Sequence, residues 1–307
     1  MKIISNTTEF SIPQNTVVAI GKFDGFHKGH HKLIDMAVEQ KKRGLAVAVY
    51  TFVPSPAIFW GKGNVQELST IEEKRHIFER AGADYLVEYP FNQEVADMEP
   101  ETYIKDVLID KMHAKCIVAG TDVSFGKKGA GNYELLQTLS EKYGYQVILI
   151  DKVQFQNREI SSTFVKEQIK AGNMEVVTQL LENPYSVTGR IVHGKQLGRT
   201  IGMPTVNVIP EKEKLLPPNG VYFSYVELHG KRYPSVTNIG KKPTVDNSEV
   251  IGVETYIYDF SGDIYGETIS VFLLKFRRPE MRFSGVEELK NQMEQDLQAG
   301  RAFHEIG

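Results

Sequence analysis

Two histidines near the N-terminus have the spacing and the surroundings of a phosphate site. His27 and His30 are three residues apart, after an apolar run at 17–20 and before a stretch of helical apolar spacing at 33–37. On a helix that begins near His27, these two imidazoles share one face, whereas His31 points elsewhere. The free N–H groups at the start of such a helix suit a polyphosphate. The alternative is a strand–turn–helix corner whose histidines only decorate the surface.

The longer string around the histidines is more specific than the histidines alone. Its glycines permit tight turns and a close approach of backbone to a ligand. The sequence Gly-Lys-Phe-Asp-Gly-Phe-His-Lys-Gly-His-His at 21–31 resembles the signature of the adenylyltransferase module of bacterial riboflavin kinase/FAD synthetases, which are HxGH nucleotidyltransferases. The resemblance implies that His27 and His30 stabilise charge on the ATP phosphates during adenylyl transfer. Positioning and electrostatics then carry the catalysis, without a covalent enzyme intermediate.

A glycine-rich string in the C-terminal half carries a second signature. Residues 189–195 superficially fit a Walker A loop, but Gln196 stands where Ser or Thr is needed and no helical pattern follows. The longer string 189–207 closely resembles the riboflavin kinase signature, and by that resemblance Thr205 and Asn207 hold magnesium. Oxygen ligands in an incomplete protein shell suit this ion. The alternative is that the glycines serve turns and Pro-Thr-x-Asn only enters a strand.

One carboxylate stands in an alternating apolar strand at 252–260. By the same resemblance Glu254 is the general base that accepts the proton of the riboflavin ribityl 5′-hydroxyl, and partial burial would raise its pKa toward a useful range. The alternative is an exposed strand glutamate.

Three segments of the first half depart from the family pattern. Ser55 stands where histidine is usual, and Val123 and Ser124 depart within the loop at 120–126. The segment at 161–166 usually reads Ser-Ser-Thr-Arg-Ile-Arg, but here Phe164 and Lys166 replace the arginines. Plain N-capping is the alternative role for its hydroxyls. These departures put the rate of adenylyl transfer in doubt.

The resemblance implies a set of nucleotide-binding residues in each half. In the first half they are Gly21, Phe23, Asp24, Gly25, Gly29, Asp122, Ser161, Ser162, Thr163 and Lys166. In the second half they are Gly189, Gly194, Gly198, Arg199, Gly202 and Pro204.

The elements that position these residues change in character along the chain. Buried strands alternate with helical patterns up to residue 184, which predicts an α/β domain with an open, mostly parallel sheet, a Rossmann-like nucleotidyltransferase domain by resemblance. Short β-rich runs with regular turns follow from Tyr185, and they predict a small antiparallel β-barrel, the riboflavin kinase domain. A final amphipathic helix at 286–297 is expected to turn Leu289 and Met293 inward. We therefore expect domains at 1–184 and 185–307.

Composition limits the remaining possibilities. The chain has 307 residues, 41% hydrophobic and 24% charged, and a formal net charge of −3, so nucleic acid is not an expected partner. Cys116, the single cysteine, lies in an apolar run and is expected in the core. There is no signal-peptide pattern and no apolar stretch of membrane-spanning length, so we expect a cytoplasmic protein with no membrane partner.

The sequence therefore predicts a bifunctional enzyme of this family. It would phosphorylate riboflavin to FMN and adenylylate FMN to FAD, with ATP as co-substrate and Mg²⁺ as cofactor, as a monomer or weak homo-oligomer. One alternative is the same fold with one site impaired, most plausibly the adenylyltransferase. Another is a regulatory protein that binds flavin or nucleotide.

Overall fold

The computed structural model describes residues 1–61, 65–194, 202–243 and 249–306. It divides into two compact units, Met1–Ser162 and Thr163–Gly307. In this division the two helices that precede Tyr185 belong with the C-terminal unit. The expected domain boundary at 184/185 concerns independent folding, and it stays a prediction.

The N-terminal unit alternates strands with helices. Its strands are β1 (Lys2–Ser5), β2 (Thr16–Ile20), β3 (Ala46–Val53), β4 (Tyr85–Pro90), β5 (Ala114–Gly120), β6 (Gln146–Ile150), β7 (Gln154–Phe155) and β8 (Arg158–Glu159). Its helices are α1 (Lys28–Glu39), η1 (Gln40–Arg43), α2 (Pro56–Phe59), α3 (Ile71–Arg80), α4 (Gln93–Ala96), α5 (Pro100–Thr102), the π-helix η2 (Tyr103–Lys111), η3 (Lys127–Gly129) and α6 (Tyr133–Tyr143).

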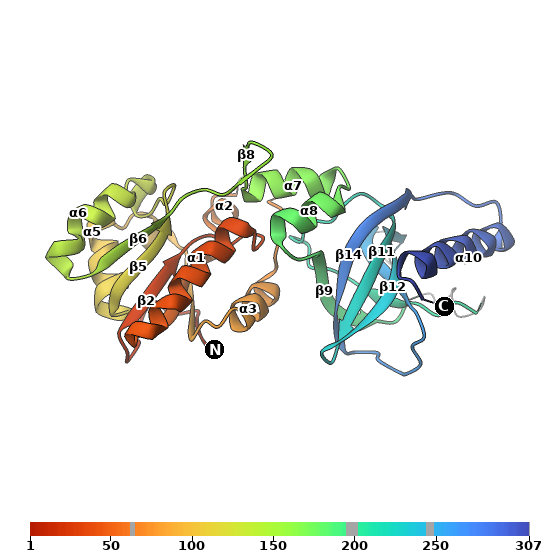
Figure 1. The fold of residues 1–307 in the computed structure, drawn as a ribbon, viewed down its shortest axis with the longest axis horizontal. Coiled ribbons are helices and arrows are strands. Elements are labelled where there is room, and N and C mark those ends of the chain that lie inside the picture. Colours follow the sequence, from red (N-terminus) through yellow and green to blue (C-terminus); the bar gives the residue numbers. More distant parts are fainter. Residues whose placement is uncertain (62–64, 195–201, 244–248, 307) are drawn as a thin grey trace. The chain divides into compact units, whose positions relative to one another are not determined.

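Six of these strands form one parallel sheet in the order β1-β4-β3-β2-β5-β6. Side chains alternate along β2, so they contribute to two hydrophobic cores, one on each face of the sheet. Val17 and Ala19 pack on the face covered by α1 and α3, whereas Val18 and Ile20 pack on the face covered by η2 and α6 (Figure 1). Because β2 is covered on both faces, all five of its residues are buried. Cys116 is buried in the first core, as the sequence predicts.

The C-terminal unit is a closed antiparallel barrel with helices packed on it. Its elements are α7 (Ser162–Lys170, which begins at the last residue of the N-terminal unit), α8 (Met174–Leu181), β9 (Tyr185–Val192), β10 (Val206–Val208), β11 (Gly220–Leu228), β12 (Lys231–Pro243), β13 (Glu249–Ile257), β14 (Thr268–Pro279) and α10 (Val286–Phe303). The strands close in the order β10-β13-β12-β11-β14-β9. The small antiparallel barrel predicted from the sequence is confirmed.

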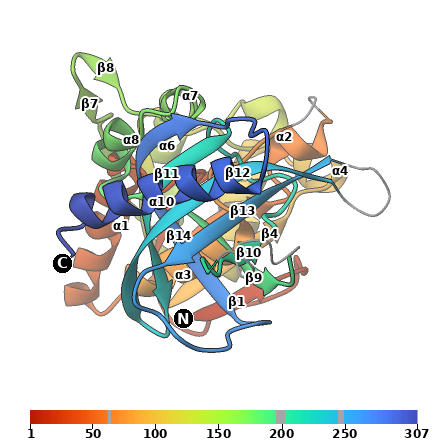
Figure 2. The ribbon, with the colours of Figure 1, turned by 90° about the vertical axis from the view of Figure 1, so that its right-hand side faces the viewer.

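The last helix, α10, crosses the barrel over β11 and β12 (Figure 2). Its most buried residues are Asp296 and Gly300, and the expected inward residues Leu289 and Met293 are only partly buried. Asp296 accepts a hydrogen bond of 2.6 Å from the Arg278 guanidinium. A buried ion pair therefore lies where the apolar pattern predicts only hydrophobic packing.

Candidate active sites

The histidine motif lies in the loop between β2 and α1, at the carboxyl end of a central strand. Ligands of open parallel sheets bind at this edge. His27 is the N-cap residue of α1, and its ring stacks on that of His30 with the centroids 3.8 Å apart and an interplanar angle of 16°. The shared face that the three-residue spacing predicts is therefore present.

Hydrogen bonding fixes the proton on one of these rings. His30 Nδ1 lies 3.1 Å from the carbonyl oxygen of Gly25. Since a carbonyl oxygen can only accept, Nδ1 carries the proton, and the neutral ring presents the lone pair of Nε2. Nδ1 of His27 is buried and makes no hydrogen bond to another described residue. An orphaned buried polar atom of this kind suits a site that a polar ligand completes.

Both rings are neutral near pH 7. Burial, and next the charge of His31, lower the pKa of His27 to about 4, against the opposing carboxylates of Asp24 and Asp122. Burial, and next the charge of His27, lower the pKa of His30 well below its ordinary value. A polyphosphate at this site would raise both pKa values, because an anion favours the protonated ring.

Two glycines of the motif leave room that a side chain would fill. A Cβ on Gly25, where φ is +67°, would lie 2.4 Å from Cδ1 of Leu68. A Cβ on Gly29 would lie 3.2 Å from Cε1 of His27. Gly29 thus lets the first turn of α1 pass directly against the His27 ring.

The remaining predicted residues of this loop are also tied down. A Cβ on Gly21 would lie 2.9 Å from the ring of Phe23, which is itself buried. Asp24 is held at two points: its Oδ1 accepts from the backbone N–H of Leu68 at 2.5 Å, and its carbonyl oxygen accepts from the Ser162 hydroxyl at 2.6 Å. These contacts fix the backbone that leads into the histidines.

The other predicted nucleotide ligands of the first half lie at the ends of β5 and at α7. Asp122 follows β5, which neighbours β2, so its carboxylate belongs to the same edge of the sheet as the histidines. Ser161 is exposed and directly precedes α7. Thr163 and Lys166 belong to the C-terminal unit, and their part in nucleotide binding stays a prediction.

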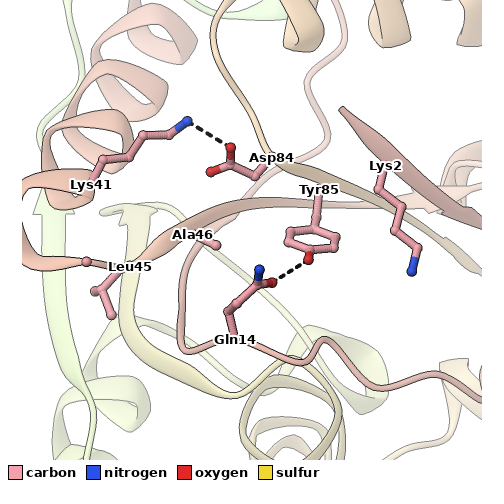
Figure 3. Close-up of a pocket in the computed structure, with 8 residues that line it drawn as sticks. Lys2, Gln14, Lys41, Leu45, Ala46, Asp84 and Tyr85 are labelled. Atoms are coloured by element: carbon pink, nitrogen blue, oxygen red, sulfur yellow. Dashed lines mark hydrogen bonds and ion pairs between the residues drawn. The ribbon is translucent and has the colours of Figure 1, made fainter.

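An open cavity of about 400 Å³ lies at the opposite edge of the same sheet (Figure 3). It is lined at the strand starts, where Lys41 Nζ pairs with Asp84 Oδ1 at 2.9 Å and the Tyr85 hydroxyl donates to Gln14. Because these polar groups already pair with one another, and the histidines are at the other edge, this cavity is not the site of the motif.

The barrel brings together the three chemistry-bearing residues predicted for it. The Thr205 hydroxyl donates a hydrogen bond of 2.6 Å to Oε1 of Glu254. Asn207 is 6% exposed and lies directly opposite Glu254 across the β10–β13 pair. A Cβ on Gly194 would lie 2.5 Å from Nδ2 of Asn207, so the glycine lets the loop after β9 pass against that amide. Glu254 is partly buried.

The oxygen donors in this group fit a magnesium ion. The hydroxyl oxygen of Thr205 and the amide oxygen of Asn207 are hard ligands, and two such ligands leave room for waters and phosphate around the ion. Because the Thr205 proton points at Glu254, the lone pairs of the hydroxyl oxygen stay available to a cation. Thr205 and Asn207 are therefore the described residues that could hold it.

The other predicted glycines of the barrel differ in their surroundings. A Cβ on Gly189 would lie 2.5 Å from Cγ1 of Val208, which is a packing requirement between β9 and β10. Gly202 has φ +81°, a Cβ on it would meet no atom of the described residues within 4 Å, and Pro204 is exposed. Two further predicted nucleotide ligands, Gly198 and Arg199, lie outside the described residues.

One residue beside the predicted base is not among the predicted catalytic or metal-binding residues. Asn238 on β12 is the direct partner of Glu254 on β13, so it extends the row of polar side chains from Asn207 through Glu254. Only the strand register reveals this neighbour, since Asn238 and Glu254 are far apart in the chain.

The fold and the sites together define a class of protein: an α/β unit with an HxGH nucleotidyltransferase motif, joined in one chain to a barrel with a kinase-like polar cluster. The FAD synthetase family model matches residues 9–164, and the riboflavin kinase family model matches residues 181–304. The chain belongs to the bifunctional riboflavin kinase/FMN adenylyltransferase family.

Similar proteins cover nearly the whole chain. The bifunctional riboflavin kinase/FMN adenylyltransferase of Listeria monocytogenes is 34% identical over 300 residues, which are 97% of this chain and 95% of that protein. The Escherichia coli K12 protein of the same name is 34% identical over 308 residues, 99% and 98% of the two chains. A crystal structure titled macrolide-efflux protein from Streptococcus pneumoniae has 32% identity and a TM-score of 0.84, covering 97% and 98%. Across the described residues, we find no helix with the length and apolarity needed to cross a membrane.

Proposed function

We propose that the two reactions of the family are carried by the residues described above, one reaction in each unit. In the barrel the riboflavin 5′-hydroxyl oxygen attacks the γ-phosphorus of ATP, giving FMN and ADP. In the N-terminal unit an FMN phosphate oxygen attacks the α-phosphorus of a second ATP, giving FAD and pyrophosphate. The stacked pair of His27 and His30 at the carboxyl end of β2 carries the proposal for the second reaction.

The histidine pair can act on charge that develops on the polyphosphate. With Nδ1 of His30 donating to Gly25, Nε2 can donate to a phosphate oxygen only after it takes up a proton. The negative charge of ATP favours that uptake, and the resulting imidazolium stabilises the leaving pyrophosphate. Nδ1 of His27 is a second free position for a ligand atom. The enzyme's contribution is then positioning and electrostatics.

The barrel residues divide the work of phosphoryl transfer. Glu254 is the general base for the 5′-hydroxyl proton, and the Thr205 hydroxyl fixes the orientation of its carboxylate. Magnesium, when bound by Thr205 and Asn207, supplies neutralisation of phosphate charge. Asn207 is suited to this because burial holds its amide in one place.

Single substitutions in each unit test the assignment. The chain is incubated with ATP and magnesium and with either riboflavin or FMN, and FMN and FAD are resolved by chromatography. His27→Ala should remove FAD formation and leave FMN formation untouched. Glu254→Gln should abolish FMN formation from riboflavin, whereas FAD formation from supplied FMN survives.

Other outcomes would change the proposal. A fall of both activities in either variant, with folding intact, would overturn the assignment of separate sites. A wild-type chain that forms FMN but no FAD would instead show an impaired adenylyltransferase, for which the departures at Phe164 and Lys166 give a reason. We also propose that the protein works in the cytoplasm, where ATP is available, as a monomer or weak homo-oligomer.

A further inference from the structure

A largely buried ion pair lies beside the histidine site, and the mechanism above does not use it. Nζ of Lys74, on α3, is 3.2 Å from Oε2 of Glu67, and the two side chains are 11% and 14% exposed. An ion pair withdrawn from water is costly to break, because the partner that remains is left buried without compensation. The pair therefore fixes the segment that carries Glu67 against α3.

That segment forms one wall of the turn that leads to the histidines. Leu68, next to Glu67, donates its backbone N–H to Oδ1 of Asp24 at 2.5 Å. The Leu68 side chain fills the space beside Gly25, where a Cβ would lie 2.4 Å from Leu68 Cδ1. The carbonyl oxygen of Gly25 in turn accepts from Nδ1 of His30 at 3.1 Å. Contacts thus run without a break from Glu67 to the ring of His30.

The helix α3 reaches the same ring by a second route. Phe78 lies one turn after Lys74, and both side chains are on the buried face of α3. The rings of Phe78 and Phe23 meet edge to face at 5.0 Å, and Phe23 lies 5.1 Å from the ring of His30. Lys74 therefore shares the buried face of α3 with Phe78, whose ring reaches His30 through Phe23.

The charge of Lys74 also acts on His30. Burial and the charge of His27 are the main causes that lower the pKa of His30, and His31 and Lys74 lower it further. The carbonyl of Gly25 opposes them. Removing the ammonium would therefore move the pKa of His30 upward.

We propose that the Lys74–Glu67 ion pair positions His30 for adenylyl transfer, by holding Leu68 against the turn at Asp24 and Gly25. The inference rests on the proposed FMN adenylyltransferase activity of this unit. Lys74 is a positioning residue in this proposal, and it acts through Glu67 and Leu68 on the carbonyl that orients the His30 ring.

The test compares Lys74→Met and Lys74→Arg in the full chain. Lys74→Met should lower kcat for FAD formation from FMN about tenfold, since small displacements of a catalytic group are costly, and should change KM for ATP little. Lys74→Arg keeps the ion pair and should recover most of the rate. By NMR, the titration of His30 should move to higher pH in Lys74→Met and stay near the wild-type position in Lys74→Arg. FMN formation from riboflavin should be unchanged in both.

A double-mutant cycle and a matched control complete the test. Glu67→Gln should lower the rate as Lys74→Met does, and the two changes together should cost little more than either one, because they break one pair. The control is Lys105→Met, which removes two exposed ion pairs of the same unit, with Asp106 and with Asp110 at 3.0 Å each, and should leave both activities unchanged.

Several outcomes would overturn the inference. Additive effects of the two changes would mean that Lys74 acts independently of Glu67, and a joint loss of FMN formation would mean a general folding role. If the wild-type chain forms FAD and Lys74→Met is equally fast, the positioning role alone fails. If the wild-type chain forms no FAD, the adenylyltransferase proposal itself fails.

Discussion

The histidine pair shows how burial sets the chemistry of single residues. An isolated histidine is partly protonated near neutral pH, but desolvation keeps His27 and His30 uncharged here. Two stacked imidazolium rings would repel each other, so the uncharged form is also the one that allows a centroid distance of 3.8 Å. The site is thus prepared to take up protons when an anionic ligand arrives, and not before.

Burial of His27 predicts a loss of stability in acid. Its pKa is lowered to about 4 in the folded chain, whereas the unfolded chain keeps the ordinary value of 6.5. The stabilising effect is therefore present above pH 6.5 and is lost as the pH falls toward 4. When the pH falls from 7 to 5, the unfolding free energy of the wild type should therefore drop by about 2 kcal/mol more than that of His27→Gln.

Urea unfolding at the two pH values, followed by fluorescence, measures this difference. The single tryptophan, Trp60, lies in the N-terminal unit and reports on that unit alone. The carboxylates titrate in both proteins, so their contribution cancels in the comparison. Parallel loss of stability in the two proteins would show that His27 is not buried as described.

The sequence predicts the residues that bear chemistry better than the residues that support them. The spacing of His27 and His30 is enough to place both rings on one helix face. The sequence does not reveal the partners of Lys74 and Asn238, because an ion pair with Glu67 and a register opposite Glu254 arise only from the folded backbone.

At the scale of elements, the sequence predicts the helices and strands with regular apolar patterns well. It predicts less well where an element continues past a break in its pattern. The apolar pattern predicts a helix at 133–143 and a strand at 220–228, and the structure has both elements with these bounds. The β-rich pattern at 231–236 predicts a shorter strand than β12, which continues to Pro243 because polar residues and Gly240 are accommodated by pairing with β13. Strand β1, a short exposed edge at Lys2–Ser5, has too few apolar residues to be predicted.

The loop after β9 gives a prediction for magnesium affinity. Gly194→Ala would place a Cβ 2.5 Å from Nδ2 of Asn207 and displace that amide. If Asn207 holds magnesium, the Mg²⁺ concentration for half-maximal FMN formation should rise about tenfold, as is typical when a metal ligand loses its support. Titration of riboflavin phosphorylation with Mg²⁺ measures the change.

Gly285→Ala is the matched control, because a Cβ there meets no atom within 4 Å in the part of the chain that the structure describes. It should leave the magnesium requirement unchanged. If the magnesium requirement is also unchanged in Gly194→Ala, with the barrel folded, Asn207 does not hold the magnesium ion.

The helix α7 gives a prediction for the rate of adenylyl transfer. Phe164 is buried, so an arginine there would bring a guanidinium into an apolar core and test folding as much as catalysis. Lys166 is partly exposed and can be replaced cleanly. If this position meets phosphate, as the family resemblance implies, Lys166→Arg should speed FAD formation by up to about tenfold through its bidentate guanidinium.

Steady-state FAD formation from FMN measures this effect, with Lys170→Arg on the same helix as the control. Lys170 is exposed, and its replacement should leave the rate as it is. An unchanged or lower rate in Lys166→Arg, with riboflavin phosphorylation intact, would show that other groups of this chain neutralise the phosphate charge.

At the scale of the whole molecule, the two units have separate cores and separate polar clusters. The parallel sheet is buried by its own helices on both faces, and the barrel closes on itself without an open edge. A change of composition near Tyr185 predicts this division approximately. It does not predict that α8 belongs to the barrel, because an amphipathic helix does not reveal in its sequence which core it covers.

The last prediction concerns fragments of the C-terminal unit. Residues 186–307 contain all but the first residue of the barrel and should phosphorylate riboflavin alone. Helix α8 packs on β9 and β14, buries Met174, Val177 and Leu180 completely, and pairs Glu175 with Lys275 at 3.0 Å. Residues 163–307 retain these contacts and should therefore be more stable, by roughly 3–5 kcal/mol for the buried side chains.

Denaturant unfolding of the two fragments, with riboflavin phosphorylation as the functional readout, separates the possibilities. Equal midpoints would show that α8 is no part of the barrel's core. An inactive or insoluble 163–307 fragment, with the full chain active, would show that the barrel depends on the N-terminal unit. A stable, active 163–307 fragment beside a weaker 186–307 fragment would place the folding boundary before α8, where the compact units divide.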